Sequence, residues 1–529
     1  MKYQGLTIGP IVKTVQKAES TRGLWASSYI ISYLIKKIIT ELRENGIRDD
    51  AFVIPLVSDP RIFDAHRGAG LFPDRVIFKT DNDFNLLKKS IKNAISAFIL
   101  ETKEVIKKEI PIGKLKLSFD ADYEKYLNEY FLIYAISKEL KDIDNEIEGC
   151  NKSLSVLELQ QPIQPEQEID YLSYLFEAIN KTDLPKNAGF STGRFPSIFE
   201  ISSNELRLIN QNEYDEAIDA FLDNDTDGLE YLKEEFKNDF KRRHKYIAIV
   251  KADGDNMGKA VEQINKKDKT LVRKVDKLLL DFNIDSIEMI HQFGGKSIYL
   301  GGDDILFFAP ISFGEKKTVF KLINSLSDSY NKKFTELFEE CKTVEENFWK
   351  DVIDEEEVII KQPTLSFGAS ISYYKYPMFE AIDIANQLLE ESKEGVKNAV
   401  TFKVTKHSGQ SFGSRISKES VTYSEFFMKM LENSIEDSDF LSSVQFQLNQ
   451  YSHVVEAALV SGKTALENYF KNFFNEPVHG LKEDFLTNIC AFLWQAFQDT
   501  NDVKIALEIV YSTLRTSQFM NQKDNENEQ

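Results

Sequence analysis

Three aspartates lie where two strands are expected to end, and their spacing indicates metal-dependent phosphoryl-transfer chemistry. Asp253 follows the apolar run 246–250, and Asp303 and Asp304 lie in IYLGGDDILFFAP, between two strand-like runs. Carboxylates gathered at one end of a sheet repel one another unless a divalent cation neutralises them. Oxygen ligands of this kind suit Mg²⁺ or Mn²⁺. A pair of such ions can clamp triphosphate oxygens, activate an attacking hydroxyl and stabilise the leaving pyrophosphate.

The glycines and lysines near these aspartates fit the same chemistry. Gly301 and Gly302 accept positive φ without steric cost, which favours a sharp hairpin turn and the close approach of a ligand. Lys393 and Lys397 lie four residues apart around the end of an expected helix and could supply positive charge to phosphates. Lysines in such positions are equally often ordinary surface residues.

Each motif alone is a weak signal. A GGDD hairpin is usually only a turn, and DGDN resembles an Asx turn or a fragment of a calcium loop. The two motifs become specific together, because each ends a strand and one helix separates them. The basic run KRRHK at 241–245 is expected to be a solvated linker, with a local RNA contact as the alternative.

The elements that position these residues predict an α/β fold in which one unit occurs twice. Residues 1–160 show the order strand, helix, strand, strand, helix, strand, and residues 244–409 repeat it. This order is typical of a ferredoxin-like antiparallel sheet. Residues 161–243 are expected to form a mainly helical link. Residues 410–529 are expected to be helical and to end in a disordered polar tail, NQKDNENEQ.

Composition places the chain among cytoplasmic globular proteins. Hydrophobic residues make up 42% and charged residues 28% of the 529 residues. Three scattered cysteines exclude a disulfide framework and a zinc ribbon, and they suit a reducing compartment. No signal peptide is visible, and the longest apolar stretches are too short to cross a bilayer. A net charge of −20 argues against a wide nucleic-acid surface, although a local patch or partner subunits could still contact RNA.

The sequence resembles the large polymerase-like subunit of type III CRISPR RNA-guided effector complexes, in the Cmr branch. In the second half the resemblance rests on IVKADGDNMGK, IYLGGDDILFFAP, TLSFGASISYYKYP and KHSGQSFG. In the first half it rests on LTIGPIVKTVQKAESTRGLWASSYIISYL, AGLFPDRVIF and STGRFPSIFEI. It covers nearly the whole chain. The GGDD and DGDN elements also occur in other palm polymerases and cyclases, whereas the N-terminal stretch and KHSGQ are more specific.

The resemblance implies two palm domains, the first degenerate and the second catalytic, together with helical domains. It implies an ATP-dependent nucleotidyltransferase that is activated when guide RNA pairs with target RNA in a complex with other protein subunits. The product would be a cyclic oligoadenylate, or an AMP conjugate of S-adenosylmethionine. Asp253, Asp303 and Asp304 would hold Mg²⁺ or Mn²⁺ with help from Asp255. The nucleotide would lie against three glycines and two lysines, namely Gly254, Gly301, Gly302, Lys393 and Lys397.

The chain departs from the family pattern at its start. Many members begin with an HD nuclease domain, but here the first palm is expected almost from Met1, and no histidine adjoins an aspartate. The six histidines are scattered, so no DNA cleavage is expected from this chain. Two alternatives stay open: a free-standing diguanylate or nucleotide cyclase, and a non-enzymatic scaffold subunit of the same complex. Ile305 argues against the first, because diguanylate cyclases usually carry phenylalanine at that position.

Overall fold

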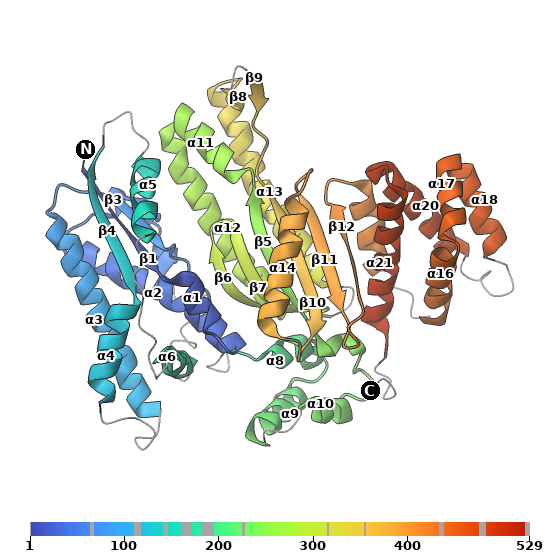
Figure 1. Cartoon of the computed structure of the whole chain (residues 1–529), viewed down its shortest axis with the longest axis horizontal. Coiled ribbons are helices and arrows are strands. Elements are labelled where there is room, and N and C mark those ends of the chain that lie inside the picture. The colour runs from blue at the N-terminus through green and yellow to red at the C-terminus, as the bar shows by residue number, and fades with distance from the viewer. Residues whose placement is uncertain are drawn as a thin grey trace.

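The computed structural model contains two large β-sheets side by side, followed by a group of helices (Figure 1). The first sheet is drawn in blue and cyan, the second runs from green to orange, and the C-terminal helices are red. The structure describes residues 2–63, 68–109, 118–140, 146–159, 171–180, 195–224, 228–314, 317–353, 356–432, 438–474 and 483–523.

The first sheet has the strand order β2-β3-β1-β4, with antiparallel neighbours throughout. Its connections give the order strand, helix, strand, strand, helix, strand, which confirms the expected ferredoxin-like unit. The strands are β1 (Lys2–Gly9), β2 (Phe52–Ile54), β3 (Arg75–Lys79) and β4 (Leu132–Glu139). The helices are α1 (Ile11–Gln16), α2 (Thr21–Glu44), α3 (Phe84–Glu109), α4 (Phe119–Tyr130) and α5 (Glu146–Glu158).

The described part of the link is helical, as expected. It contains α6 (Tyr171–Asn180), α8 (Ile198–Ser203), α9 (Gln211–Asn224) and α10 (Gly228–Glu235). Helix α8 begins with a capping box, in which the Ser197 side chain accepts from Glu200 N and the Glu200 carboxylate accepts from Ser197 N. The sequence also predicts a loop at QPIQPEQ, residues 161–167, and this segment lies outside the described residues.

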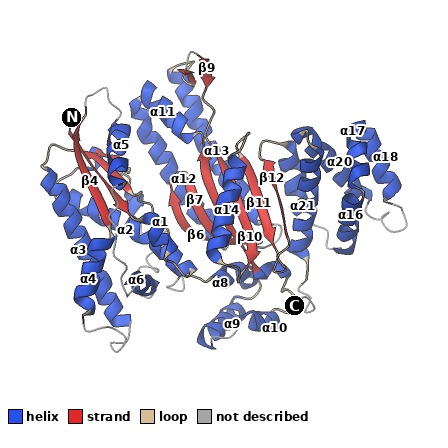
Figure 2. Cartoon of the chain, in the orientation of Figure 1, coloured by secondary structure: helices blue, strands red, loops and turns tan. Residues whose placement is uncertain are grey.

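The second sheet extends a ferredoxin-like core by two strands, in the order β12-β11-β10-β5-β7-β6 (Figure 2). The core strands are antiparallel, whereas β11 runs parallel to β10. The strands are β5 (Tyr246–Asp255), β6 (Lys296–Gly301), β7 (Asp304–Pro310), β10 (Thr364–Tyr373), β11 (Ala399–Thr405) and β12 (Ser411–Ser417), and β8 (Lys350–Ile353) and β9 (Glu356–Ile359) form a separate hairpin. The helices are α11 (Met257–Lys267), α12 (Val272–Gln292), α13 (Val319–Val344) and α14 (Met378–Lys393).

Two details of this half differ from the sequence prediction. The helix that precedes the fourth core strand, β10, is α13, which the sequence did not predict. The helix that was expected to end near Lys393 is α14, and it follows β10 instead of preceding the last core strand. The expected boundary at 409/410 falls in the hairpin between the paired strands β11 and β12. The helical end of the chain therefore begins after β12.

The C-terminal helices pack beside β12, mainly through α21. They are a π-helical turn (Thr422–Phe427), α15 (Met428–Glu432), α16 (Ser438–Gln450), α17 (Ser452–Ser461), α18 (Lys463–Phe473), α20 (Glu483–Thr500) and α21 (Val503–Asn521). The polar tail NQKDNENEQ was expected to be disordered, but its first residues are ordered: Asn521 ends α21, and Gln522 O accepts from Arg242 N at 3.0 Å. The rest of the tail, from 524 onwards, lies outside the described residues. No helix among the described residues is long and apolar enough to cross a membrane.

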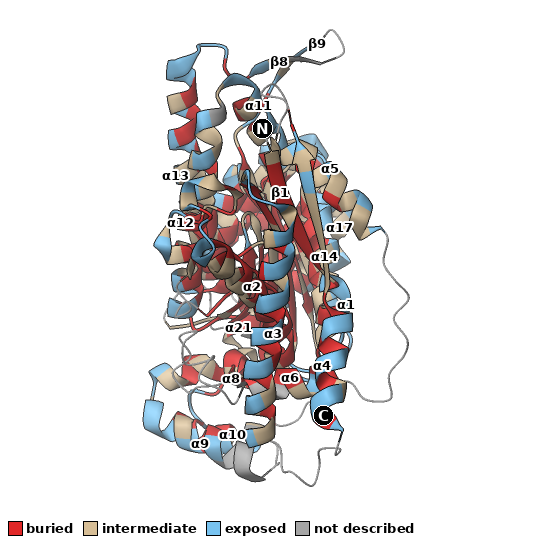
Figure 3. Ribbon diagram, turned by 90° about the vertical axis from the view of Figure 1, so that its left-hand side faces the viewer, coloured by how far each residue is buried: buried red, intermediate tan, exposed pale blue. Residues whose placement is uncertain are grey.

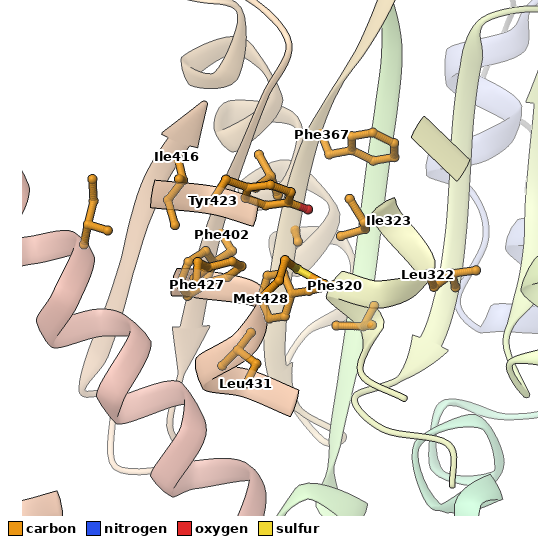
Figure 4. Packing of buried hydrophobic residues seen from close by; sticks show 14 of the residues in the cluster. Phe320, Leu322, Ile323, Phe367, Phe402, Ile416, Tyr423, Phe427, Met428 and Leu431 are labelled. Carbon is orange, nitrogen blue, oxygen red and sulfur yellow. The ribbon is translucent and has the colours of Figure 1, made fainter. Parts of the chain in front are cut away.

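Two cores cover the opposite faces of the second sheet. On one face, Phe320 of α13 contacts Phe402 and Phe427 edge-on, with ring centroids 5.0 and 5.1 Å apart (Figure 4). On the other face, Ile249 and Phe308 share a core with α14 and with helix α2 of the first unit. Buried residues accordingly follow the strands and inner helix faces, while the outer face of α3 is exposed (Figure 3). The first unit thus packs on the α14 face.

The basic run KRRHK is not a solvated linker, which corrects the sequence prediction. His244 is buried, and its Nε2 lies 2.9 Å from Glu205 Oε2. Arg243 donates to both oxygens of the same carboxylate, at 2.7 and 3.0 Å, and to Met520 O at 2.7 Å. Glu205 also accepts from Ser312 Oγ and Gly314 N. This set of contacts joins the helical link, the second sheet and the end of α21.

Candidate active site

The predicted aspartates gather at the end of β5 and the adjoining start of β7. In the β5–β7 register, Ala252 pairs with Ile305 and Lys251 with Leu306, so Asp253 and Asp304 lie in the next row. Leu306 belongs to the core on the α14 face. Because side chains alternate along a strand, Asp253 and Asp304 are directed to that face as well.

The turn before β7 is centred on Gly302 and Asp303 rather than on the two glycines. Gly301 pairs with Asp304, which leaves a two-residue loop, and Gly302 has φ of 79°. This is the position at which such a hairpin needs glycine. The Asn283 side chain of α12 holds the loop: its amide nitrogen donates to Gly302 O at 2.8 Å, and its oxygen accepts from Gly302 N at 3.1 Å. The amide orientation is assigned from these two contacts.

Asp303 packs directly against the backbone of Gly254. A Cβ at position 254 would come within 2.8 Å of Asp303 Cβ, and closer still to its carboxylate. Real Cβ atoms essentially never make such contacts, so only glycine fits here without a shift. Burial raises the pKa of Asp303, and the neighbouring charges of Asp304 and Asp255 raise it further.

Asp253 is paired with Lys393, at the last residue of α14. Burial lowers the pKa of Lys393, and the positive charges of Lys397 and Lys251 lower it further. Three lysines therefore lie near the carboxylates on the α14 face. The structure brings Lys393 to Asp253 directly, while Lys397 lies close enough to act on Lys393 through its charge.

Asp304 is held by two residues that the sequence analysis did not single out. Tyr299 of β6 donates its hydroxyl to Asp304 Oδ2 at 2.6 Å. The ammonium of Lys251 lies 3.4 Å from Asp304 Oδ1 and also contacts the Tyr299 hydroxyl. Both residues lie on the strands next to the aspartates, so the alternation of side chains along those strands was the sequence signal that could have pointed to them.

Asp255 is fully buried and fixes the neighbouring strands. Its Oδ2 accepts from Thr364 Oγ1 at 2.9 Å, from Ser366 Oγ at 2.8 Å and from Asn398 N at 3.0 Å. Its Oδ1 is buried without a hydrogen bond. Beside it, Lys418 donates to Leu365 O at 2.6 Å, and burial lowers the pKa of Lys418 to about 7, against the opposing charge of Asp255.

The residues fit a hard divalent cation, although their side chains do not converge on one. Among the described residues, no three histidine, cysteine, aspartate or glutamate side chains form a group that could hold a metal ion. The donors are nevertheless all carboxylate oxygens, as Mg²⁺ and Mn²⁺ require. The buried Oδ1 atoms of Asp255 and Asp304 accept no hydrogen bond. Lysine ammonium groups lie against two of these carboxylates, Lys393 at Asp253 and Lys251 at Asp304.

Two cavities among the described residues lie away from these carboxylates. One, of about 930 Å³, lies between the end of α14, strand β12 and the start of α21. The other, of about 700 Å³, separates α5 from α11. None of the four aspartates lines either of them, so the candidate site rests on side-chain chemistry at the strand ends.

A ferredoxin-like sheet that carries aspartates at the end of its first strand and at the adjoining start of its third strand has the architecture of a palm domain. The family model "Cas10/Cmr2, second palm domain" matches residues 246–401, and "CRISPR-associated protein Cmr2, N-terminal" matches residues 3–112. The two segments together make up half of the chain, which belongs to the Cas10/Cmr2 family of type III-B CRISPR systems. The resemblance found in the sequence is thereby confirmed.

The chain is also similar to individual proteins. It is 25% identical over 218 residues to "CRISPR system Cmr subunit Cmr2" of Pyrococcus furiosus, a match that covers 36% of this chain and 22% of that protein. The chain thus spans about a fifth of the length of this curated relative. A chain of the apo type III-B Cmr-beta complex matches with a TM-score of 0.52 and 12% identity, covering 88% of this chain and 77% of that chain. This likeness shows the fold.

Proposed function

We propose that this chain is the nucleotidyltransferase subunit of a type III-B CRISPR effector complex. It uses ATP and a divalent cation to make a nucleotide second messenger when target RNA pairs with guide RNA. The product is a cyclic oligoadenylate or an AMP conjugate of S-adenosylmethionine. The single observation that carries the proposal is the row of carboxylates and lysines at the ends of β5 and β7, in a chain of the Cas10/Cmr2 family.

The carboxylates and the lysines of the candidate site would have different roles. Asp253, Asp304 and Asp303 would hold Mg²⁺ or Mn²⁺, and Asp255 would assist them. The bound ions would supply charge neutralisation at the triphosphate and activation of the attacking hydroxyl. Lys393 and Lys397 would bind phosphate oxygens, since each presents a compact positive charge near the carboxylates.

The glycines give the backbone room beside these groups. Gly254 leaves space for Asp303, and Gly301 with the adjoining turn at Gly302 would let the nucleotide approach the main chain. The partners in this proposal are other protein subunits, guide RNA and target RNA. DNA cleavage is not part of it, because the sequence offers no histidine–aspartate motif for a nuclease.

The assembled complex, given labelled ATP and target RNA, is expected to release a new nucleotide product. Mass spectrometry with and without S-adenosylmethionine would identify it. The double variant Asp303→Ala, Asp304→Ala is expected to make at least about a thousandfold less product, because the transition-state charge loses its metal ligands. Product at the wild-type level from this variant would refute the site. RNA binding without any product from the wild-type complex would favour a scaffold role.

A further inference from the structure

A lysine–tyrosine pair lies one row behind the candidate metal ligands, across three neighbouring strands. Leu306 of β7 pairs with Lys251 of β5 on one side and with Tyr299 of β6 on the other. The Lys251 ammonium reaches across this row and lies 5.0 Å from the centre of the Tyr299 ring. Both side chains then meet Asp304, which begins the next row.

The two residues act on different oxygens of the same carboxylate. Tyr299 donates to Oδ2 at 2.6 Å, while Lys251 lies 3.4 Å from Oδ1, which accepts no hydrogen bond. The Asp304 side chain is 40% exposed and that of Lys251 is 20% exposed, so their attraction is only partly screened by water. Tyr299 therefore orients the Asp304 carboxylate, and Lys251 neutralises its charge.

A neutral donor and a cation have opposite effects on metal binding. A tyrosine hydroxyl is neutral near pH 7, and that of Tyr299 donates to Asp304 Oδ2, so it can hold the carboxylate whether or not a cation is bound. A partner of this kind orients a metal ligand and raises metal affinity. A lysine beside the same carboxylate already supplies the positive charge, and a metal ion must compete with it.

We propose that Tyr299 is a positioning residue for Asp304, that Lys251 is its internal counter-ion, and that the two set the divalent-cation affinity of the site in opposite directions. This inference rests on the proposed function, because it takes Asp304 as a metal ligand. It adds that Asp304 is oriented and neutralised before any metal binds, and that metal binding releases Lys251 from Asp304.

The test measures Mn²⁺ binding to the full chain without nucleotide, by titration calorimetry and by the loss of the free Mn²⁺ paramagnetic resonance signal. Tyr299→Phe keeps the ring and removes the hydroxyl, and it is expected to weaken Mn²⁺ binding about tenfold. Lys251→Met removes the competing charge and is expected to tighten it about fivefold. Lys251→Arg keeps the charge and is expected to bind Mn²⁺ as the wild type does.

Two controls separate this inference from the proposed function. Tyr423→Phe removes another buried hydroxyl, one without a hydrogen bond, in the core on the opposite face, and it should leave Mn²⁺ binding unchanged. Asp304→Ala should abolish binding at the site. If the wild type binds no Mn²⁺, or Asp304→Ala binds it equally well, both the metal site and this inference fail. If Asp304→Ala behaves as expected but the other two variants leave affinity unchanged or shift it in one direction, only this inference fails.

Discussion

Replacing Gly254 by alanine is expected to reduce nucleotide product at least about a hundredfold, since displacing a catalytic group by about 1 Å has effects of this size. The added Cβ would overlap the Asp303 side chain, which packs on the Gly254 backbone. Asp303 must then move, and the two-residue turn that carries it must move too. The strand itself can persist, because Gly254 lies next to the end of β5 and is only partly buried.

Gly258 offers a matched control for this variant. It lies four residues further on, and a Cβ there would meet nothing within 4 Å. Gly258→Ala is therefore expected to keep full activity and to stabilise the start of α11 slightly. The measurements are product formed by the assembled complex and the thermal unfolding of each variant. Wild-type activity in Gly254→Ala would show that the position of Asp303 does not matter for catalysis.

The sequence predicted those parts of the site that local pattern encodes. Asp253 and Asp304 each adjoin a strongly apolar run, so their place at strand ends followed from strand periodicity and turn chemistry. Tyr299 and Lys251 were missed because each looks like an ordinary strand residue. Their contacts with Asp304 depend on the register between three strands, which no local sequence pattern shows.

Long-range contacts explain the other differences. Asn283 lies in the middle of a helix, and only the packing of α12 under the turn brings its amide to Gly302. KRRHK looked solvated because four of its five residues are cationic by type, and such runs usually face water. Its partner, Glu205, lies 38 residues before Arg243, beyond the reach of any local pattern.

The Glu205 cluster predicts a stability that falls in acid. Burial would raise the pKa of Glu205, but hydrogen bonds from His244 and Arg243 outweigh it and lower the pKa to about 2. A lowered carboxylate pKa stabilises the fold above about pH 4.5, and this contribution is lost as pH falls towards 2. Burial also lowers the pKa of His244, and Lys241 N donates to its Nδ1, so the native ring is neutral. Because the unfolded chain takes up this proton below about pH 6.5, the loss of stability begins there.

Glu205→Gln is therefore expected to lower the free energy of unfolding by about 3 kcal/mol at pH 7. The variant leaves Arg243 and His244 buried without their carboxylate, and the segments they join, around Ser312 and Met520, lose a shared anchor. Denaturant unfolding followed by tryptophan fluorescence from pH 7 to pH 3 should show the gap between wild type and variant closing as pH falls. Asp215→Asn removes an exposed partner of Arg207 in the same link and should cost less than about 1 kcal/mol at any pH. A gap that stays constant with pH would mean that Glu205 supports the fold through shape and hydrogen bonds alone. A closing gap would identify its charge as the link between the second palm, the helical linker and the C-terminal helix.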